Sequence, residues 1–319
     1  MSKALPKISI VFVAVIIGAF ALGPRVDINT QIETFTLPAD LDHYLAESEQ
    51  KHTDIIANTE KHIQWAHADK RPTKTVIVYL HGFSASRQEI SPVSENLARK
   101  LGANLYLARL TGHGRGSAPM GDATVNSWVN DATEAMAIGR KLGERVVLIG
   151  TSTGGTLATW AAAQQNDTAP DALILVSPNF KPVGFGAWML TMPWGLEIAE
   201  LVFGPERNFE SSKASGPSYW TKRYPTSAIT VMMGLVDLVN ATDLSTIQVP
   251  VLTLYSPNDG VVSAEATESA LARFGSKINE HLQILDALDQ HVISGDIRSP
   301  NTTARVTEAA QVFITKVLK

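Results

Sequence analysis

The sequence predicts an α/β fold in which a mostly parallel sheet is flanked by helices and carries a helical cap insertion. Apolar, β-branched runs alternate with segments of helical spacing from residue 75 to residue 317. Such alternation is typical of a parallel sheet with right-handed crossovers. The alternation is interrupted at about 178–249, after the fourth strand. An insertion there would lie over the carboxyl ends of the strands, where open α/β sheets place their sites.

Composition narrows the class of protein. The chain has 319 residues, of which 45% are apolar, and its net charge is −4. It can therefore bury a large core, and it lacks the basic surface that a nucleic-acid partner requires. The chain contains no cysteine, so disulfides, thiolate metal sites and cysteine nucleophiles are excluded.

The first 25 residues predict export. Lys3 and Lys7 precede an uncharged apolar run, 8–23, whose 16 residues would span about 24 Å as a helix, short of a hydrocarbon core of roughly 30 Å. Ala19-Phe20-Ala21 within the run is a small-x-small pattern that a signal peptidase could cut. Residues 1–25 are thus expected to be a signal peptide or an N-terminal membrane anchor, a transmembrane helix. Either one places the protein in the periplasm, or on a membrane facing away from the cytoplasm.

Residues 26–319 are expected to form the folded domain, beginning with a polar lead-in. The lead-in shows helical spacing over Leu41–Ile56 and a possible early strand at His62–Ala66. Near-continuous apolar runs then suit strands that are buried on both faces. These strands are expected at Thr75–Leu80, Asn104–Leu110, Arg145–Ile149, Ala172–Val176, Pro250–Tyr255 and His281–Leu285. Helices are expected at Pro92–Leu101, Val125–Leu142, Thr156–Gln164, Ala264–Phe274 and Thr303–Val317.

The insertion is rich in aromatic residues and is expected to form short helices without a strand. Its aromatic side chains could line an apolar pocket or simply pack the cap against the core.

Ser152 is the candidate nucleophile. Gly150-Thr151-Ser152-Thr153-Gly154 lies directly between a buried strand and a helix, the context that a G-x-S-x-G motif requires. Ser152 should adopt a strained backbone conformation, and a Cβ at Gly150 or Gly154 should collide with neighbouring backbone. The alternative is a glycine-rich connection that cradles phosphate, but neither phosphate-binding glycine pattern occurs here.

His291 is the candidate general base, because it follows the last core strand and could reach across the strand ends. Asp259 follows the strand that ends at Tyr255 and could orient the imidazole. Asp286 and Asp289 are the competing carboxylates, but they are sequence neighbours of His291.

The oxyanion hole is assigned to the backbone N–H groups of Phe83 and Thr153. One N–H should come from the loop after the first core strand, and the other from the residue after the nucleophile. His113, in a second glycine-rich loop, is expected to be structural.

Together these motifs resemble the α/β-hydrolase superfamily, and bacterial carboxylesterases and monoacylglycerol-lipase-like enzymes most of all. The resemblance spans about residues 73–319. It is carried by Leu80-His81-Gly82-Phe83, Gly112-His113-Gly114, the Ser152 motif, Pro257-Asn258-Asp259 and His291. The loop after the first core strand reads His81-Gly82-Phe83 rather than His-Gly-Gly-Gly, so hormone-sensitive-lipase-like esterases are a poorer match. Serine at position 152 argues against haloalkane dehalogenases and epoxide hydrolases.

The resemblance implies hydrolysis of small carboxylic esters, with short- to medium-chain acyl groups or monoacylglycerol-like substrates. The Ser152–His291–Asp259 triad would act through an acyl-enzyme, without metal or cofactor. An aminopeptidase, thioesterase or acyltransferase would use the same triad. A non-catalytic, membrane-tethered binding protein is the alternative from another class.

Overall fold

The computed structural model describes residues 17–164, 169–184, 186–208 and 219–318. Within these residues, seven strands form one sheet in the order β1-β3-β2-β4-β5-β8-β9. Every neighbouring pair is parallel except β1 with β3, which is antiparallel. The predicted mostly parallel sheet is therefore confirmed. Its strands are β1 His62–Gln64, β2 Thr73–Leu80, β3 Asn104–Leu107, β4 Gly143–Thr151, β5 Ala172–Val176, β8 Val251–Tyr255 and β9 Asn279–Gln283.

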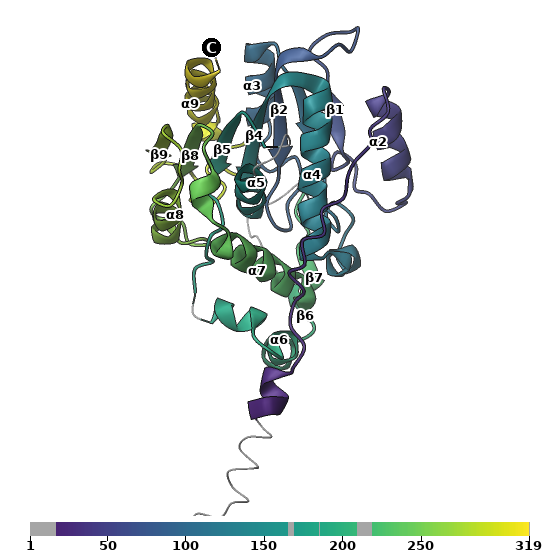
Figure 1. Ribbon diagram of the computed structural model, residues 1–319, viewed down its shortest axis with the longest axis vertical. Helices are drawn as coiled ribbons and strands as arrows, with labels where there is room; N and C mark the ends of the chain where they lie inside the picture. Colours follow the sequence, from purple (N-terminus) through teal and green to yellow (C-terminus); the bar gives the residue numbers. More distant parts are fainter. Residues whose placement is uncertain (1–16, 165–168, 185, 209–218, 319) are drawn as a thin grey trace, which may run out of the picture.

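Helices cover both faces of the sheet (Figure 1). Helices α4 (Val125–Leu142), α5 (Thr153–Ala163) and α7 (Thr226–Ala241) pack on one face, and α3 (Val93–Leu101) and α9 (Pro300–Val317) on the other. Helix α8 (Ala264–Leu271) contributes to the first of these layers.

Strand β2 shows why the core strands are apolar throughout. Val76, Val78 and Leu80 face the layer with α4 and α5, whereas Ile77 and Tyr79 face the layer with α3 and α9. Successive side chains of a strand point to opposite faces, so a sheet covered on both faces needs an apolar residue at every position.

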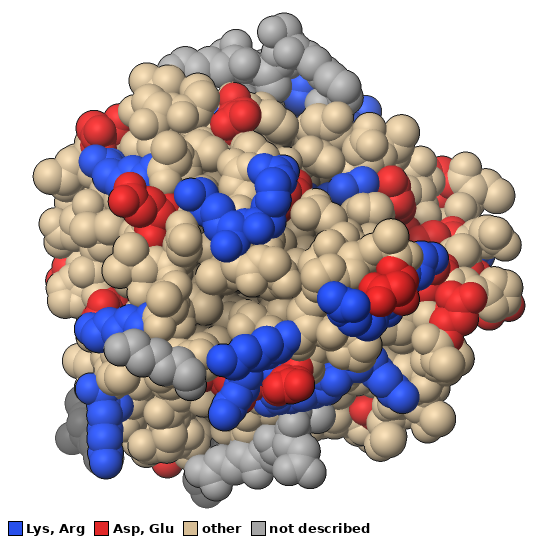
Figure 2. All heavy atoms as spheres, turned by 90° about the horizontal axis from the view of Figure 1, so that it is seen from above, with Lys and Arg blue, Asp and Glu red and all other residues tan. Residues whose placement is uncertain are grey.

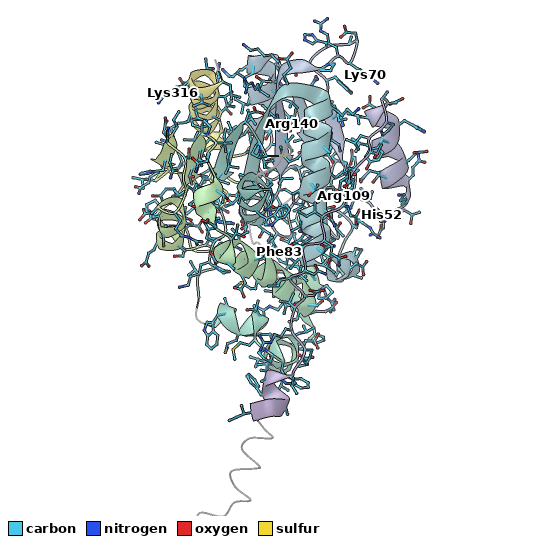
Figure 3. The ribbon with its side chains drawn as sticks, in the orientation of Figure 1. His52, Lys70, Phe83, Arg109, Arg140 and Lys316 are labelled. Atoms are coloured by element: carbon cyan, nitrogen blue, oxygen red, sulfur yellow. The ribbon has the colours of Figure 1, made fainter. Side chains whose placement is uncertain are left out.

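The lead-in is held on the outside of this core. Helix α2 (Leu41–Gln50) begins at Asp40, whose side chain accepts the His43 N–H, and it ends earlier than the expected Ile56. Glu49, in its last turn, forms a two-pronged ion pair with the buried Arg109. This pair ties α2 to the segment that follows β3 (Figure 3).

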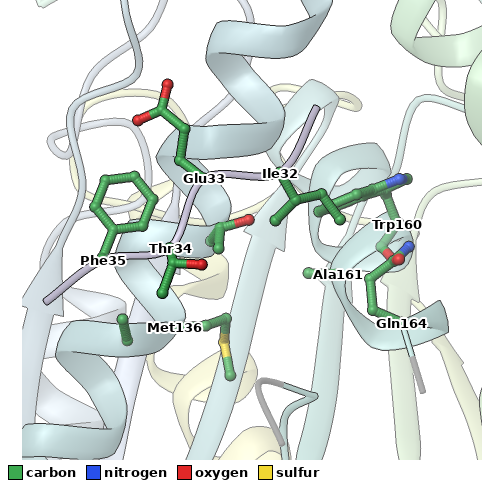
Figure 4. Close-up of a pocket in the computed structure, with 10 residues that line it drawn as sticks. Ile32, Glu33, Thr34, Phe35, Met136, Trp160, Ala161 and Gln164 are labelled. Atoms are coloured by element: carbon green, nitrogen blue, oxygen red, sulfur yellow. The ribbon is translucent and has the colours of Figure 1, made fainter. Parts of the chain in front are cut away.

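An extended segment before α2 crosses helices α4 and α5 (Figure 4). The buried Asn130 of α4 accepts the Glu33 N–H at 2.9 Å and donates to the Gln31 carbonyl at 3.1 Å. A pocket of 230 Å³ lies under the segment, and Met136 and Trp160 are among the residues that line it.

The expectation that the insertion contains no strand is wrong, because two of its segments pair as strands. Strands β6 (Glu206–Asn208) and β7 (Arg223–Pro225) pair antiparallel within it, beside helix α6 (Gly195–Phe203) and the 3-10 turn η2 (Ala187–Thr191). These strands are too short and polar to show strand periodicity in the sequence. Helix α7, at the end of the insertion, buries its apolar side chains in the main core, so only the earlier part stands apart as a cap.

The expected signal peptide or anchor, residues 1–25, lies mostly outside the described residues. The first described residues, 17–21, are helical. In the part of the chain that is described, no helix is both long enough and apolar enough to cross a membrane.

Asn130→Ala should loosen the lead-in. The change removes both hydrogen bonds to the backbone of residues 31 and 33, each of which contributes about 0.5–1.5 kcal/mol. Urea unfolding should show this loss of stability, and limited proteolysis should cut within 26–36 faster. Asn301→Ala, which removes one exposed hydrogen bond to the Asp286 carbonyl, is the control; equal stability and equal proteolysis of the two variants would contradict this role for Asn130.

Candidate active site

Ser152 lies in the sharp turn between β4 and α5. Its φ is +52° and its ψ is −119°, a sparsely populated conformation for a residue with a side chain, which typically costs about 1–3 kcal/mol. Hydrogen bonds hold the turn in place: the Ser152 N–H donates to the Val176 carbonyl at 2.9 Å, and the Ser152 carbonyl accepts from Gly155 and Asn179. The strained conformation is therefore fixed from both sides.

The two glycines of the motif are required by close backbone contacts, as expected. A Cβ on Gly150 would lie 2.3 Å from the Gly154 carbonyl oxygen, and a Cβ on Gly154 would lie 2.2 Å from that of Leu80. Because the contacted atoms are backbone, they cannot rotate away as a flexible side chain could. The motif thus brings the turn directly against the end of β2, where the loop 81–84 begins.

The structure brings Ser152, His291 and Asp259 into one chain of hydrogen bonds. His291 Nε2 lies 3.0 Å from Ser152 Oγ, and His291 Nδ1 lies 2.8 Å from Asp259 Oδ2. The Asp259 side chain is only 2% exposed, and its second oxygen accepts the N–H groups of Val261 and Val262. An imidazole placed in this way can remove a proton from the hydroxyl while the buried carboxylate fixes its tautomer.

The competing carboxylates have other partners. Asp289 Oδ1 accepts the N–H groups of His291 and Val292 at 2.9 and 3.0 Å, and the side chain pairs with Arg298 at 2.7 Å. Asp286 pairs with Arg305 at the surface. Asp289 therefore shapes the loop that carries His291, and Asp259 is the carboxylate that contacts the imidazole.

The loop 81–84 presents the Phe83 N–H without an internal partner. The neighbouring N–H groups are both taken by buried side chains: Gly82 donates to Glu89 at 2.7 Å, and Ser84 donates to His113 Nε2 at 3.0 Å. Within the described residues, neither the Phe83 N–H nor the Thr153 N–H has a hydrogen-bond acceptor. Thr153 opens helix α5, where the first N–H groups have no intrahelical partner. Both groups remain available to an oxyanion.

Glu89 was not singled out in the sequence, where it is simply one charged residue in a polar loop. In the structure its side chain is buried beside the site and also accepts a hydrogen bond from the Tyr79 hydroxyl at 3.1 Å. The same hydroxyl lies 3.2 Å from the hydroxyl of Thr151, the residue before Ser152. Burial raises the pKa of Glu89 from its ordinary 4.5 to about 7.

The two histidines of the site loops are fully buried and act as supports. His81 Nε2 accepts the Leu110 N–H at 3.1 Å, and the His113 ring lies edge-on to those of His81 and Phe83. Burial lowers the pKa of His113 to about 4, so it is neutral near pH 7 and can accept the Ser84 N–H. The expected structural role of His113 fits these contacts.

Ser152 lines a pocket of 280 Å³. Phe83, which also lines it, lies between the end of the sheet and α7 (Figure 3). Most of its wall is apolar and comes from both the core and the insertion. The apolar lining includes Phe83, Pro182, Trp220, Tyr224, Ile229, Met232, Val261, Val262 and Val292. Of the aromatic residues in the insertion, Trp220 and Tyr224 line this pocket, whereas Trp188, Trp194 and Phe203 are exposed. No group of three or more His, Asp and Glu side chains in the described residues could hold a metal ion.

Comparison with known proteins agrees with the fold. A family model described as "Serine aminopeptidase, S33" matches residues 71–294. A thermostable monoacylglycerol lipase from Bacillus sp. (strain H-257) is 23% identical over 242 residues, covering 76% of this chain and 92% of the relative.

Solved structures show the same architecture. One, from a study of the metagenome-derived lipolytic enzymes LipS and LipT, has a TM-score of 0.65 at 24% identity, with 82% of this chain and 99% of the other covered. A soluble variant of monoglyceride lipase from Saccharomyces cerevisiae has a TM-score of 0.63 at 14% identity, covering 81% of this chain and 91% of its own.

Glu89→Gln should change how stability depends on pH. Between pH 4.5 and about 7 the unfolded chain is ionised at Glu89 while the folded chain keeps the proton, so stability falls as pH rises through this window. Glutamine removes that penalty. Relative to the parent protein, the unfolding free energy of the variant should therefore increase by up to about 3 kcal/mol from pH 5 to pH 8.

Urea unfolding of both proteins at the two pH values measures this shift. The exposed Glu308→Gln serves as the control, and a shift no larger than the control's would show that Glu89 does not titrate in this window.

Proposed function

Because the chain belongs to the serine aminopeptidase family of α/β-hydrolases, we propose that it cleaves carboxylic esters through Ser152, His291 and Asp259. The single observation that carries the proposal is the His291 imidazole, which lies within hydrogen-bond distance of both a strained serine hydroxyl and a buried carboxylate. All three residues fall inside the region that the family model matches.

In the proposed reaction, His291 takes the proton of Ser152 as Oγ attacks the ester carbonyl. The N–H groups of Phe83 and Thr153 donate to the oxyanion that forms. The imidazolium, stabilised by Asp259, then protonates the leaving alcohol, and the bond between the acyl group and the alcohol breaks. Water, deprotonated by His291, releases the acid from Ser152 and restores the hydroxyl.

The pocket lining supports an apolar acyl group. Aromatic and aliphatic side chains from the core and the cap surround the space beside Ser152, and its 280 Å³ suits a short- to medium-chain acyl group or a monoacylglycerol-like ester. The name of the Bacillus relative, a monoacylglycerol lipase, points the same way.

An aminopeptidase is the second candidate, because the family description names that activity. An aminopeptidase must bind the ammonium group of its substrate, which favours an available carboxylate in the pocket. Two carboxylates line this pocket beside the Ser152 site. Glu89 accepts from Gly82 and Tyr79, and Asp289 accepts from the His291 loop and pairs with Arg298. These existing partners favour an uncharged ester over a free amino terminus.

We also propose that the protein is exported, either to the periplasm or to a membrane on which it faces away from the cytoplasm. The support is the sequence of residues 1–25, in which two lysines precede an uncharged apolar run. Either a cleaved signal peptide or a retained anchor would place the catalytic domain outside the cytoplasm.

Ser152→Ala should abolish ester hydrolysis. Without the hydroxyl no acyl-enzyme can form, so kcat/KM for a p-nitrophenyl ester should fall by more than about 1,000-fold. A fluorophosphonate probe should label the parent protein and leave the variant unlabelled. Parallel assays with thioesters and aminoacyl amides compare the rival activities; faster turnover of the amides would favour an aminopeptidase. Full esterase activity in the variant would exclude Ser152 as the nucleophile.

Asp259→Asn should lower kcat by about 10,000-fold, because an amide cannot hold the imidazole in the correct tautomer or stabilise its charge. Asp289→Asn is the matched control: an amide oxygen can still accept the N–H groups of the His291 loop, so the loss should be about tenfold or less. Initial rates with one ester compare the two, and similar losses would point to a general loop effect.

A further inference from the structure

The outer side of the cap carries a group of exposed apolar side chains, named here the cap face. Charged and polar residues normally cover such a surface, and a contiguous apolar patch marks a site of interaction. The cap face consists of Trp188, Met189, Ile198, Leu201, Val202 and Phe203. Leu201 is 87% exposed and Val202 is 64% exposed. A helix packed on one face normally places its large aliphatic residues on the buried side.

On α6 the apolar residues form one row. Ile198, Leu201 and Val202 recur at spacings of three and four from Trp194, the residue that precedes the helix. That spacing places them on one side of the helix; Glu200 falls outside the row, and Glu197 lies at its edge, next to Leu201. The row continues into a second cavity of 250 Å³, lined by Ile198, Val202 and Phe203.

The first described residues of the chain join this surface. Trp194 donates its backbone N–H to the Pro24 carbonyl at 2.8 Å and its indole N–H to the Ala19 carbonyl at 3.3 Å. The Trp194 backbone has a φ of +63°, a strained value for a bulky residue, and these contacts hold it. Figure 1 shows residues 17–24 directly beside α6, at the opposite end of the molecule from the C-terminal end of α9.

Residues 17–24 also add exposed apolar side chains of their own, Ile17, Phe20 and Leu22, to this end of the molecule. They belong to the uncharged run 8–23, which at a helical rise reaches about 24 Å of a roughly 30 Å hydrocarbon core. The opposite end of the molecule differs, because lysines, arginines and carboxylates are interspersed over it (Figure 2).

We propose that the cap face lies on the same lipid bilayer as the N-terminal run, and that ester substrates reach Ser152 from that bilayer. The proposal rests on the proposed ester hydrolysis and on the retained-anchor form of the N-terminal run. A bilayer is the occupant because the apolar run of the sequence leads directly to the cap face, so one apolar phase would cover both. Tryptophan at the edge of such a surface, as at 188 and 194, suits the interface between hydrocarbon and water.

The cavity under the cap face and the pocket that holds Ser152 share one lining residue. Ile229 of α7 lines both the cavity under the cap face and the pocket that holds Ser152. The two spaces therefore adjoin at Ile229. An acyl chain that leaves the bilayer at the cap face would pass beside Ile229 to reach the nucleophile.

The absence of cysteine allows a direct test on the full chain. Leu201→Cys, on the cap face, and Val312→Cys, 62% exposed on α9, are each labelled with a polarity-sensitive fluorophore. The proteins are reconstituted into phosphatidylcholine vesicles that contain nitroxide-labelled lipid. The label at 201 should shift to shorter wavelength and be quenched by the nitroxide, and the label at 312 should not.

Three results would overturn the proposal: no quenching at 201, equal quenching at both positions, or a spectral shift at 201 without lipid that grows with protein concentration. The last result would assign the cap face to a second copy of the chain.

A kinetic measurement tests the entry of substrate. Leu201→Asp should lower the rate on an ester dissolved in vesicles by about tenfold or more, because a charged side chain cannot lie in the hydrocarbon, and it should leave the rate on a water-soluble ester unchanged. Val312→Asp should change neither rate. An equal loss on both esters would indicate a damaged cap and contradict entry from the bilayer. If no ester is cleaved by the parent protein, the proposed function fails, and the fluorescence result still decides whether the cap face meets lipid.

Discussion

The backbone contact between the Ser152 turn and the end of β2 is the constraint on which the site depends. Leu80 pairs with Gly150 across β2 and β4, and the α-carbon of Gly154 lies so close to the carbonyl groups of Leu80 and His81 that no side chain could stand between them. This contact sets where the nucleophile lies relative to the loop 81–84. It also explains why two glycines flank a residue whose own backbone is strained, since the turn can be this tight only where Cβ atoms are absent.

Buried polar groups hold the loop 81–84 in place beside this contact. Glu89 and His113 each accept one N–H of the loop 81–84, one on either side of Phe83, and Tyr79 connects Glu89 to Thr151 beside the nucleophile. Because buried polar groups are costly without partners, these hydrogen bonds resist any rotation of the loop. In the described part of this loop and turn, the N–H groups of Phe83 and Thr153 are left without an internal partner.

The insertion serves both the site and the surface. Its last helix, α7, is part of the hydrophobic core and presents Ile229 and Met232 to the substrate pocket. Its earlier part, η2 and α6, contributes little to that core and exposes its apolar row beside the first described residues of the chain. A single insertion therefore shapes the pocket from inside and provides an apolar surface outside, which connects the proposed hydrolysis to a proposed bilayer source of substrate.

The sequence by itself determined the alternation of strands and helices and the place of Ser152 between them. Both are local properties: an apolar run marks a buried strand, and glycines mark a tight turn. It also placed Asp259 and His291 on loops after strands, since the carboxyl ends of parallel strands meet at one edge of a sheet. The paired strands β6 and β7 could not be predicted, because three-residue strands have no measurable periodicity.

Only the tertiary structure decided which carboxylate contacts His291. Asp259, Asp286 and Asp289 have the same side chain, and they differ in the partners that folding brings to them. The same reason applies to Glu89 and to the cap face. Burial of one charged residue and exposure of a row of apolar ones depend on contacts between segments far apart in the chain.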